Sequence, residues 1–218
     1  MKAEYWQQKW QSNEIGFNQA EPNQLMQRYF SCLNLESHAR IFVPLCGKSI
    51  DMLWLSAQGY EVIGVELSQL ACDAFFKENN KVASVFELSA FTVFQKEPIT
   101  LFAGDFFQLS KKQIGQLDAV YDRAALIALP TELRKRYVAY LLTLLDKNTQ
   151  VFLIVTSYDQ RDMEGPPFSV DEQEVKALYG EHFNIKQLYK KIIKVIPDHL
   201  HAKGLKSAIE QVYCLQTK

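Results

Sequence analysis

The chain of 218 residues has a formal net charge of −1, and 48% of its residues are hydrophobic. This size and apolar content suit one large folded domain, with two domains as a less favoured alternative. The near-neutral charge gives no electrostatic reason to expect a nucleic acid or an anionic membrane surface as a partner. The four cysteines lack C-x-x-C spacing and lie in mostly apolar contexts, which is typical of reduced thiols in a cytosolic protein.

The N-terminal residues 1–17 carry charges and glutamines where a signal peptide would need an apolar stretch. No segment approaches the roughly 20 apolar residues of a membrane span. We therefore expect a cytoplasmic protein. Residues 1–39 have a helical and aromatic pattern with no obvious place in a sheet, and we expect them to form a lid over the carboxyl ends of the strands, where open α/β folds bind ligands.

From residue 40 onward, apolar strand patterns alternate with amphipathic helix patterns, which predicts an α/β fold with a mostly parallel sheet and helices on both faces. The predicted strands are 40–45, 61–67, 91–94, one within 99–107, 117–121 and 150–158. The predicted helices are 49–58, 68–77, 130–145 and one that begins at Ser169 or Asp171. The last two strand patterns, 183–196 and 207–217, predict an antiparallel C-terminal hairpin.

The stretch "RIFVPLCGKSIDMLWL" predicts a strand, a tight turn and a helix. A Walker A loop would need its first glycine at position 42, which is Phe42, and the dinucleotide fingerprint needs three glycines where Pro44–Ser49 has one. A turn of this kind suits S-adenosylmethionine. This ligand needs a close backbone approach and a carboxylate for its ribose, but no phosphate cradle.

Two acidic residues mark the predicted cofactor site. Glu66 ends the second strand, where doubly wound folds place an acidic residue that accepts hydrogen bonds from ribose hydroxyls. Asp105 and Phe106 follow a core strand and could meet the adenine ring, one through its polar edge and one through its ring face. Alternatively, Glu66 ends its strand in solvent and Asp105 caps a turn. Taken together in this order, the residues favour a cofactor site.

Several unusual motifs make the chain resemble the bacterial branch of the thiopurine S-methyltransferase family from about Tyr5 to Tyr213. They are "YWQQKW", "VPLCGKSIDMLWL", "GYEVIGVELS", "GDFF", "YDRAALIALP" and "GPPFSV". The resemblance implies a single domain over residues 1–218, with a lid at 1–39 and a Rossmann-like class I methyltransferase core at 40–218. It also implies methyl transfer from S-adenosylmethionine to the thiol of an aromatic or heterocyclic small molecule, or to selenium or tellurium species. Transfer to oxygen or nitrogen of a metabolite, and cofactor binding without turnover, stay open as alternatives.

The resemblance also implies a set of cofactor-binding residues: Trp10, Leu45, Glu66, Asp105, Phe106 and Arg123. Arg123 is the catalytic candidate, because its fixed positive charge would favour a thiolate where cofactor and acceptor meet. The alternatives are that Trp10 only fastens the lid to the core and that Arg123 forms an ion pair with the neighbouring Asp122.

Flat apolar and polar side chains are predicted to frame the acceptor, with ordinary loop packing as the alternative: Phe17, Asn18, Pro166, Pro167 and Phe168. The family's usual Phe-His-Gln is Phe-Asn-Gln here, and the position of the C-terminal arginine that faces the substrate in mammalian relatives falls around His199 or His201. Those two histidines alone are weak evidence for a metal, so we predict none. Nothing in the sequence demands more than a monomer.

Overall fold

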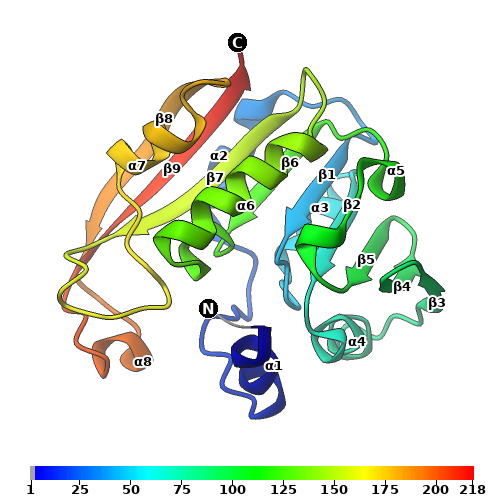
Figure 1. Ribbon diagram of the computed structural model, residues 1–218, viewed down its shortest axis with the longest axis horizontal. Coiled ribbons are helices and arrows are strands. Elements are labelled where there is room, and N and C mark those ends of the chain that lie inside the picture. Colours follow the sequence, from blue (N-terminus) through cyan, green and yellow to red (C-terminus); the bar gives the residue numbers. More distant parts are fainter. Residues whose placement is uncertain (1–2) are drawn as a thin grey trace.

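The computed structural model describes residues 3–218 and contains a nine-stranded sheet in the order β3-β4-β5-β2-β1-β6-β7-β9-β8 (Figure 1). The central strands β5, β2, β1, β6 and β7 pair in parallel. The strands at both edges pair antiparallel, β4 with β5 and β3 on one side and β9 with β7 and β8 on the other. The predicted α/β fold with a C-terminal hairpin is therefore confirmed.

The strands are β1 (Arg40–Pro44), β2 (Glu61–Glu66), β3 (Ser84–Leu88), β4 (Phe91–Lys96), β5 (Ile99–Ala103), β6 (Ala119–Arg123), β7 (Gln150–Ser157), β8 (Phe183–Ile193) and β9 (Ala208–Thr217). The α-helices are α1 (Ala3–Gln11), α2 (Gln24–Tyr29), α3 (Asp51–Ala57), α4 (Gln69–Glu78), α5 (Lys111–Ile114), α6 (Thr131–Leu144), α7 (Glu172–Tyr179) and α8 (Asp198–His201). Short 3-10 turns are η1 (Phe30–Leu33), η2 (Phe106–Gln108) and η3 (Leu126–Ala128). No helix in this described part of the chain is long and apolar enough to cross a bilayer.

Helices cover both faces of the sheet, and each face has its own hydrophobic core. On one face α6 and α7 pack against the sheet, and α6 lies in front of it in Figure 1. On the other face the covering elements are α2, η1, α3 and α4. Because β1 and β7 are enclosed between these layers, almost all of their residues are buried, which explains their continuous apolar sequence.

Local capping signals set the helix boundaries as the sequence predicted. The Oγ of Ser68 accepts the N–H of Ala71 and begins α4. Asp171, rather than Ser169, is the cap of α7, since its Oδ1 accepts the N–H of Glu174 at 2.8 Å. Gly59, with a φ of +89°, follows α3 in a conformation that favours glycine.

The sequence predicted that residues 24–33 belong to a lid, but the structure places them in the hydrophobic core. Met26, Phe30 and Leu33 are buried in the core on one face of the sheet, and the Phe30 ring packs edge-on against Phe152 of β7 at 5.3 Å. Burying these apolar side chains is worth far more to the chain than leaving them at a mobile edge. Only α1 and the segment that follows it remain near the carboxyl ends of the strands, below the arrowheads of the central strands in Figure 1.

Two strands also differ from expectation. β6 begins two residues later than predicted because the N–H of Leu117 donates to Asp146 in a loop and not to a neighbouring strand. The sequence did not predict β3, whose five residues are all exposed at the edge of the sheet. It pairs with β4 alone, so its position depends on a partner strand and not on a buried apolar pattern of its own.

Candidate functional site

The sequence-predicted site residues lie at the carboxyl ends of the parallel strands. Leu45 follows β1, Glu66 ends β2, Asp105 follows β5 and Arg123 ends β6. These strands are parallel neighbours, so their carboxyl ends share one edge of the sheet. Helix α1 lies beside this edge and contacts α4. The fold therefore brings together residues that are far apart in the sequence.

The turn after β1 is tightly curved and is covered by an aromatic ring. Leu45 and Gly47 both have left-handed backbone conformations, with φ values of +47° and +53°. A Cβ placed on Gly47 would lie only 3.0 Å from Cζ2 of Trp10, whose side chain is 7% exposed. The Nζ of Lys48 forms an ion pair with Glu78 of α4 at 2.7 Å. The turn thus offers a close backbone approach under Trp10 and no cationic phosphate clamp.

Glu66 connects this turn to the one after β2. Its Oε2 accepts the N–H of Gly47 and its Oε1 accepts the N–H of Ser68, both at 2.9 Å. The residue is only 6% exposed, so the alternative in which it ends its strand in solvent is wrong. Burial raises the pKa of the Glu66 carboxyl, while the N–H donors of Ser68 and Gly47 act in the opposite direction. The carboxylate is fixed in one orientation and still has lone pairs for further donors.

Asp105 caps a turn, as the alternative interpretation of the sequence has it, and the ring of Phe106 is not at the site. Asp105 caps η2 by accepting the N–H of Phe107 at 3.0 Å, and it remains half-buried at the edge of the sheet. Phe106 is 3% exposed, and its ring packs against Phe42 and Tyr137 with centroids 6.5 and 5.0 Å away. The prediction that this ring face meets adenine is therefore corrected, because the ring is buried in the hydrophobic core. Only the main chain of Phe106 is left for the site.

Arg123 belongs to a buried polar network at the start of α3. Its Nε donates to Oδ2 of Asp51 at 2.6 Å and its Nη2 donates to Oγ of Ser49 at 2.8 Å. The hydroxyl of Tyr121 donates to the same Asp51 oxygen at 2.7 Å, and the N–H of Asn23 donates to Oδ1 at 2.8 Å. The Arg123 side chain is 12% exposed and that of Asp51 is fully buried. A largely buried guanidinium is thus neutralised and keeps a small exposed surface at the carboxyl end of β6.

The expected alternative pairing of Arg123 with Asp122 is wrong. Successive residues of a strand point to opposite faces of the sheet, so Asp122 points toward α6 while Arg123 points toward α3. Asp122 accepts the hydroxyl of Tyr137 at 2.6 Å and the N–H of Leu126 at 3.1 Å. Burial raises the pKa of Asp122 to about 6. The actual partner, Asp51, was missed; its only sequence signal is a lone carboxylate among the apolar residues that open a helix.

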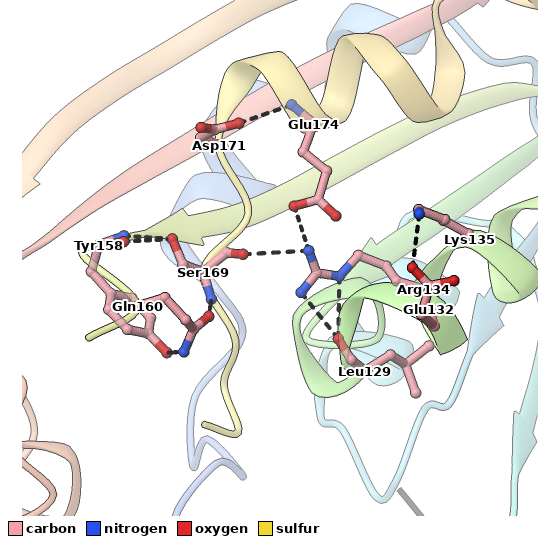
Figure 2. Close-up of polar contacts among 9 residues, drawn as sticks. All are labelled: Leu129, Glu132, Arg134, Lys135, Tyr158, Gln160, Ser169, Asp171 and Glu174. Atoms are coloured by element: carbon pink, nitrogen blue, oxygen red, sulfur yellow. Dashed lines mark hydrogen bonds and ion pairs between the residues drawn. The ribbon is translucent and has the colours of Figure 1, made fainter. Parts of the chain in front are cut away.

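The loop after β7 is held in place by a buried arginine (Figure 2). Arg134 of α6 is almost fully buried, donates to the carbonyls of Leu129 and Ser169, and pairs with Glu174 at 2.5 Å. The Oγ of Ser169 donates to the carbonyl of Tyr158 at 2.7 Å, closing the base of the loop. No sequence pattern predicts this arrangement, which fixes the segment that carries the predicted acceptor residues.

The predicted acceptor residues lie in two segments, one after α1 and one after β7, and both segments border residues 198–203. Phe17 packs edge-on against Trp10 at 5.5 Å, and Asn18 follows in the same turn. Pro166, Pro167 and Phe168 occupy the loop after β7, where the N–H of Phe168 donates to Ile127 at 2.6 Å. Both segments border residues 198–203, since Gly16 packs against the ring of His199 and Lys203 Nζ lies 3.4 Å from the Pro166 carbonyl.

The cysteine at the first turn is not placed as a nucleophile. Cys46 is buried, and burial raises the pKa of its thiol well above the usual value, so it is protonated at neutral pH. Across residues 3–218, no three His, Cys, Asp or Glu side chains are grouped so that they could hold a metal ion. The polar chemistry of the site therefore rests on Glu66, Asp105 and the network of Arg123.

Comparison with known proteins gives matches over the whole length. The family described as Thiopurine S-methyltransferase (TPMT) matches residues 1–218. A thiopurine S-methyltransferase from Nitrosospira multiformis is 43% identical over 218 residues, covering 100% of this chain and 99% of the relative.

Among solved structures, a SAM-dependent methyltransferase from Anabaena variabilis has a TM-score of 0.64 at 15% identity, covering 99% of this chain and 95% of that one. The 1,6-didemethyltoxoflavin-N1-methyltransferase of Burkholderia thailandensis, solved with 1,6-didemethyltoxoflavin and S-adenosylhomocysteine bound, has a TM-score of 0.62 at 15% identity. That match covers 99% of this chain and 87% of the other. At such identities the structural matches establish a shared fold.

Proposed function

We propose, from the premise that the chain belongs to the thiopurine S-methyltransferase family, that it methylates the sulfur of an aromatic or heterocyclic thiol. Membership of this family makes the protein a methyltransferase whose cofactor is S-adenosylmethionine and whose acceptor is a small molecule. The thiol is the proposed part, together with selenium or tellurium species as further acceptors. The observation that carries the proposal is the fixed positive charge of Arg123 at the edge of the sheet where the predicted cofactor residues converge.

The residues at this edge fit the cofactor. Gly47 has no side chain and the nearest atoms to its Cα face belong to Trp10, so a ligand can approach the backbone there once Trp10 moves. Glu66 presents a fixed, buried carboxylate to ribose hydroxyls, and Lys48 is diverted to Glu78 and away from any phosphate. The residues that would hold the cofactor are Trp10, Leu45, Glu66, Asp105, the main chain of Phe106 and Arg123.

When bound, S-adenosylmethionine supplies a methyl group that its sulfonium leaving group already activates. The protein's part is to align the acceptor sulfur with that methyl group and to exclude water, and proximity of this kind can contribute several kcal/mol. Trp10 covers the first turn and packs against Phe17, so α1 covers part of this edge of the sheet. We propose that α1 moves aside when the cofactor enters and that its return excludes water.

Arg123 would act on the acceptor through its charge. A guanidinium next to a thiol stabilises the thiolate and lowers the acceptor's pKa. The neighbouring groups are poor candidates for a general base, because Asp51 is fully buried and accepts three hydrogen bonds, Asp122 points toward α6 and Cys46 is protonated. An aromatic thiol is partly ionised near neutral pH, so the proposed mechanism needs no dedicated base.

The acceptor would lie between the two loops that border residues 198–203. Phe17 and Asn18 come from the segment after α1, and Pro166, Pro167 and Phe168 from the loop that Arg134 holds. Flat apolar surfaces of this kind suit a planar ring. We propose that these five residues contact the acceptor.

A radiolabelled-methyl screen tests the proposal. The purified protein would be offered S-adenosylmethionine with aromatic thiols, selenite, tellurite, phenols and amines, at equal concentration and at pH 7. We expect label on the thiols, with the Arg123→Ala variant losing most of that transfer at pH 7. Preferential labelling of phenols or amines, or cofactor binding without transfer to any of the acceptors, would contradict the thiol assignment.

A further inference from the structure

We propose that Asp51 is a positioning residue of the methyl-transfer site. Its buried carboxylate fixes the guanidinium of Arg123 and also holds the point where the N-terminal segment leaves the site and enters the core. The inference rests on the proposed role of Arg123 in the reaction. It concerns a residue that does not itself touch cofactor or acceptor, because its side chain is fully buried.

The first part of the inference follows from the hydrogen bonds of the guanidinium. Nε donates to Asp51 and Nη2 to Ser49, at 2.6 and 2.8 Å. Both acceptors lie at the start of the same helix, since Asp51 is the first residue of α3 and Ser49 lies two residues before it. Two bonds from one planar group to one rigid element fix the plane of the guanidinium as well as its position. A single contact would leave it free to swing.

The charge of Asp51 is needed for the same reason. A guanidinium that is almost fully removed from water requires a counter-charge, or it will turn toward solvent. Within the described chain, the carboxylate paired with Arg123 is that of Asp51. Asp51 therefore decides whether Arg123 stays at the reacting edge or swings out of it.

The second part of the inference concerns Asn23. Its N–H donates to the other oxygen of Asp51 at 2.8 Å, while its own side-chain oxygen caps α2. The chain is mostly exposed over residues 11–22 and becomes buried in the core from Met26 onward. Asn23 marks this boundary. Asp51 thus binds both the guanidinium of Arg123 on β6 and the end of the N-terminal segment that carries Trp10. These two parts must come together in a closed site.

Variants at Ser49, Asp51 and Arg123 test this arrangement. Ser49→Ala removes one anchor of the guanidinium with little risk to folding, and Asp51→Asn removes the charge. We expect kcat for a thiol acceptor at pH 7 to fall about tenfold in Ser49→Ala, the effect of losing one hydrogen bond to a charged group. A larger fall is expected in Asp51→Asn. In an Arg123→Ala background, neither change should lower kcat further.

Two readouts do not depend on turnover. The Nε–H resonance of Arg123, assigned by its loss in Arg123→Lys, should exchange slowly with water in the wild-type protein and at least tenfold faster in Ser49→Ala. Limited proteolysis within residues 11–22 should be faster in Asp51→Asn. Tyr137→Phe is the matched control, because it removes a buried donor from the carboxylate of Asp122 on the opposite face of β6. It should lower the melting temperature and leave kcat and the Arg123 resonance unchanged.

The outcomes separate this inference from the proposed function. If Arg123→Ala retains full methyl transfer to thiols, the proposed role of Arg123 fails. If Arg123→Ala loses transfer but Ser49→Ala keeps both its kcat and its slow Nε–H exchange, Asp51 and Ser49 only stabilise the fold and the inference is overturned. Equal losses from Ser49→Ala in the wild-type and Arg123→Ala backgrounds would overturn it as well. Should Asp51→Asn fail to fold, Ser49→Ala decides the question alone.

Discussion

Replacing Glu66 by alanine should weaken cofactor binding, with a smaller effect of Glu61→Ala at the other end of the same strand. The carboxylate would accept hydrogen bonds from the ribose hydroxyls of the cofactor, and those hydroxyls lose their partner in Glu66→Ala. Leaving hydrogen-bonded polar groups unpaired costs about 1 to 3 kcal/mol, which corresponds to a dissociation constant roughly 5 to 150 times larger. The cost is set by one buried side chain, so it should appear with both S-adenosylmethionine and S-adenosylhomocysteine.

The effect on stability combines two contributions that oppose each other. The N–H groups of Gly47 and Ser68 lose their acceptor, at about 1 to 3 kcal/mol each when buried. Burial raises the pKa of the Glu66 carboxyl, which means that its charged form is a burden to the folded state at neutral pH. Removing the charge relieves that burden and offsets part of the loss. We therefore expect a folded variant with a modestly lower melting temperature.

Isothermal titration calorimetry with S-adenosylhomocysteine measures the effect, and Glu61→Ala is the matched control. Glu61 lies at the opposite end of the same strand, where it forms an exposed ion pair with Arg40 at 3.0 Å. An exposed pair of this kind is worth at most about 1 kcal/mol of stability, and it lies far from the carboxyl edge. Unchanged affinity in Glu66→Ala, or an equal loss in Glu61→Ala, would remove Glu66 from the cofactor site.

Three further predictions concern Arg123, Gly47 and Asp122. Arg123→Ala should lose more thiol turnover at pH 7 than at pH 9, because alkaline solution ionises the thiol without help from the protein. A pH–rate profile measures this difference. A loss that does not depend on pH would indicate that Arg123 positions the cofactor instead. Gly47→Ala should cost about 1 to 2 kcal/mol of stability through its left-handed φ and should shift the tryptophan fluorescence, because the new Cβ would lie 3.0 Å from Trp10. Gly59→Ala, with a φ of +89° and open space around its Cβ, should cost stability without a fluorescence change, and a similar spectral shift in both variants would refute the packing argument. The folded pKa of Asp122, about 6, lies above its ordinary value of 3.8, so the stability that it contributes is present below pH 3.8 and is lost as the pH rises through 6. Denaturant titrations should therefore show that the free energy of unfolding of Asp122→Asn, relative to the wild-type protein, rises by about 3 kcal/mol from pH 3 to pH 7. A difference that stays constant over this range would mean that Asp122 does not titrate there.

Figure 1 shows helix α1 beyond the ends of the central strands and apart from the helices that cover the sheet. Helix α1 lies outside the two hydrophobic cores, and its contact with the first turn runs through Trp10. Moving α1 away would expose one aromatic ring and a few loop residues, which is a small loss of buried apolar surface compared with unpacking α2 or η1. Residues 24–33 therefore do not belong to the predicted lid, and we propose that a lid would end before Asn23, whose N–H is held by Asp51.

The sequence by itself determined the features that depend on near neighbours in the chain. Apolar runs and helix periodicity gave the order of strands and helices, and side-chain caps such as Ser68 and Asp171 fixed where helices begin. The position of Glu66 at the end of its strand, and the absence of a phosphate loop at Gly47, also followed from local pattern. Each of these is decided by interactions within a few residues, which is why it can be read before the chain is folded.

The tertiary structure decided which side chains meet across the fold. Arg123 pairs with Asp51, 72 positions away, because the alternation of β6 turns Asp122 to the opposite face and α3 presents a carboxylate to this one. The ring of Phe106 belongs to the core because α6 covers it, and residues 24–33 belong to a sheet face because that face had apolar surface to bury. Such choices depend on which element packs where, and a local pattern carries no information about a partner from elsewhere in the chain.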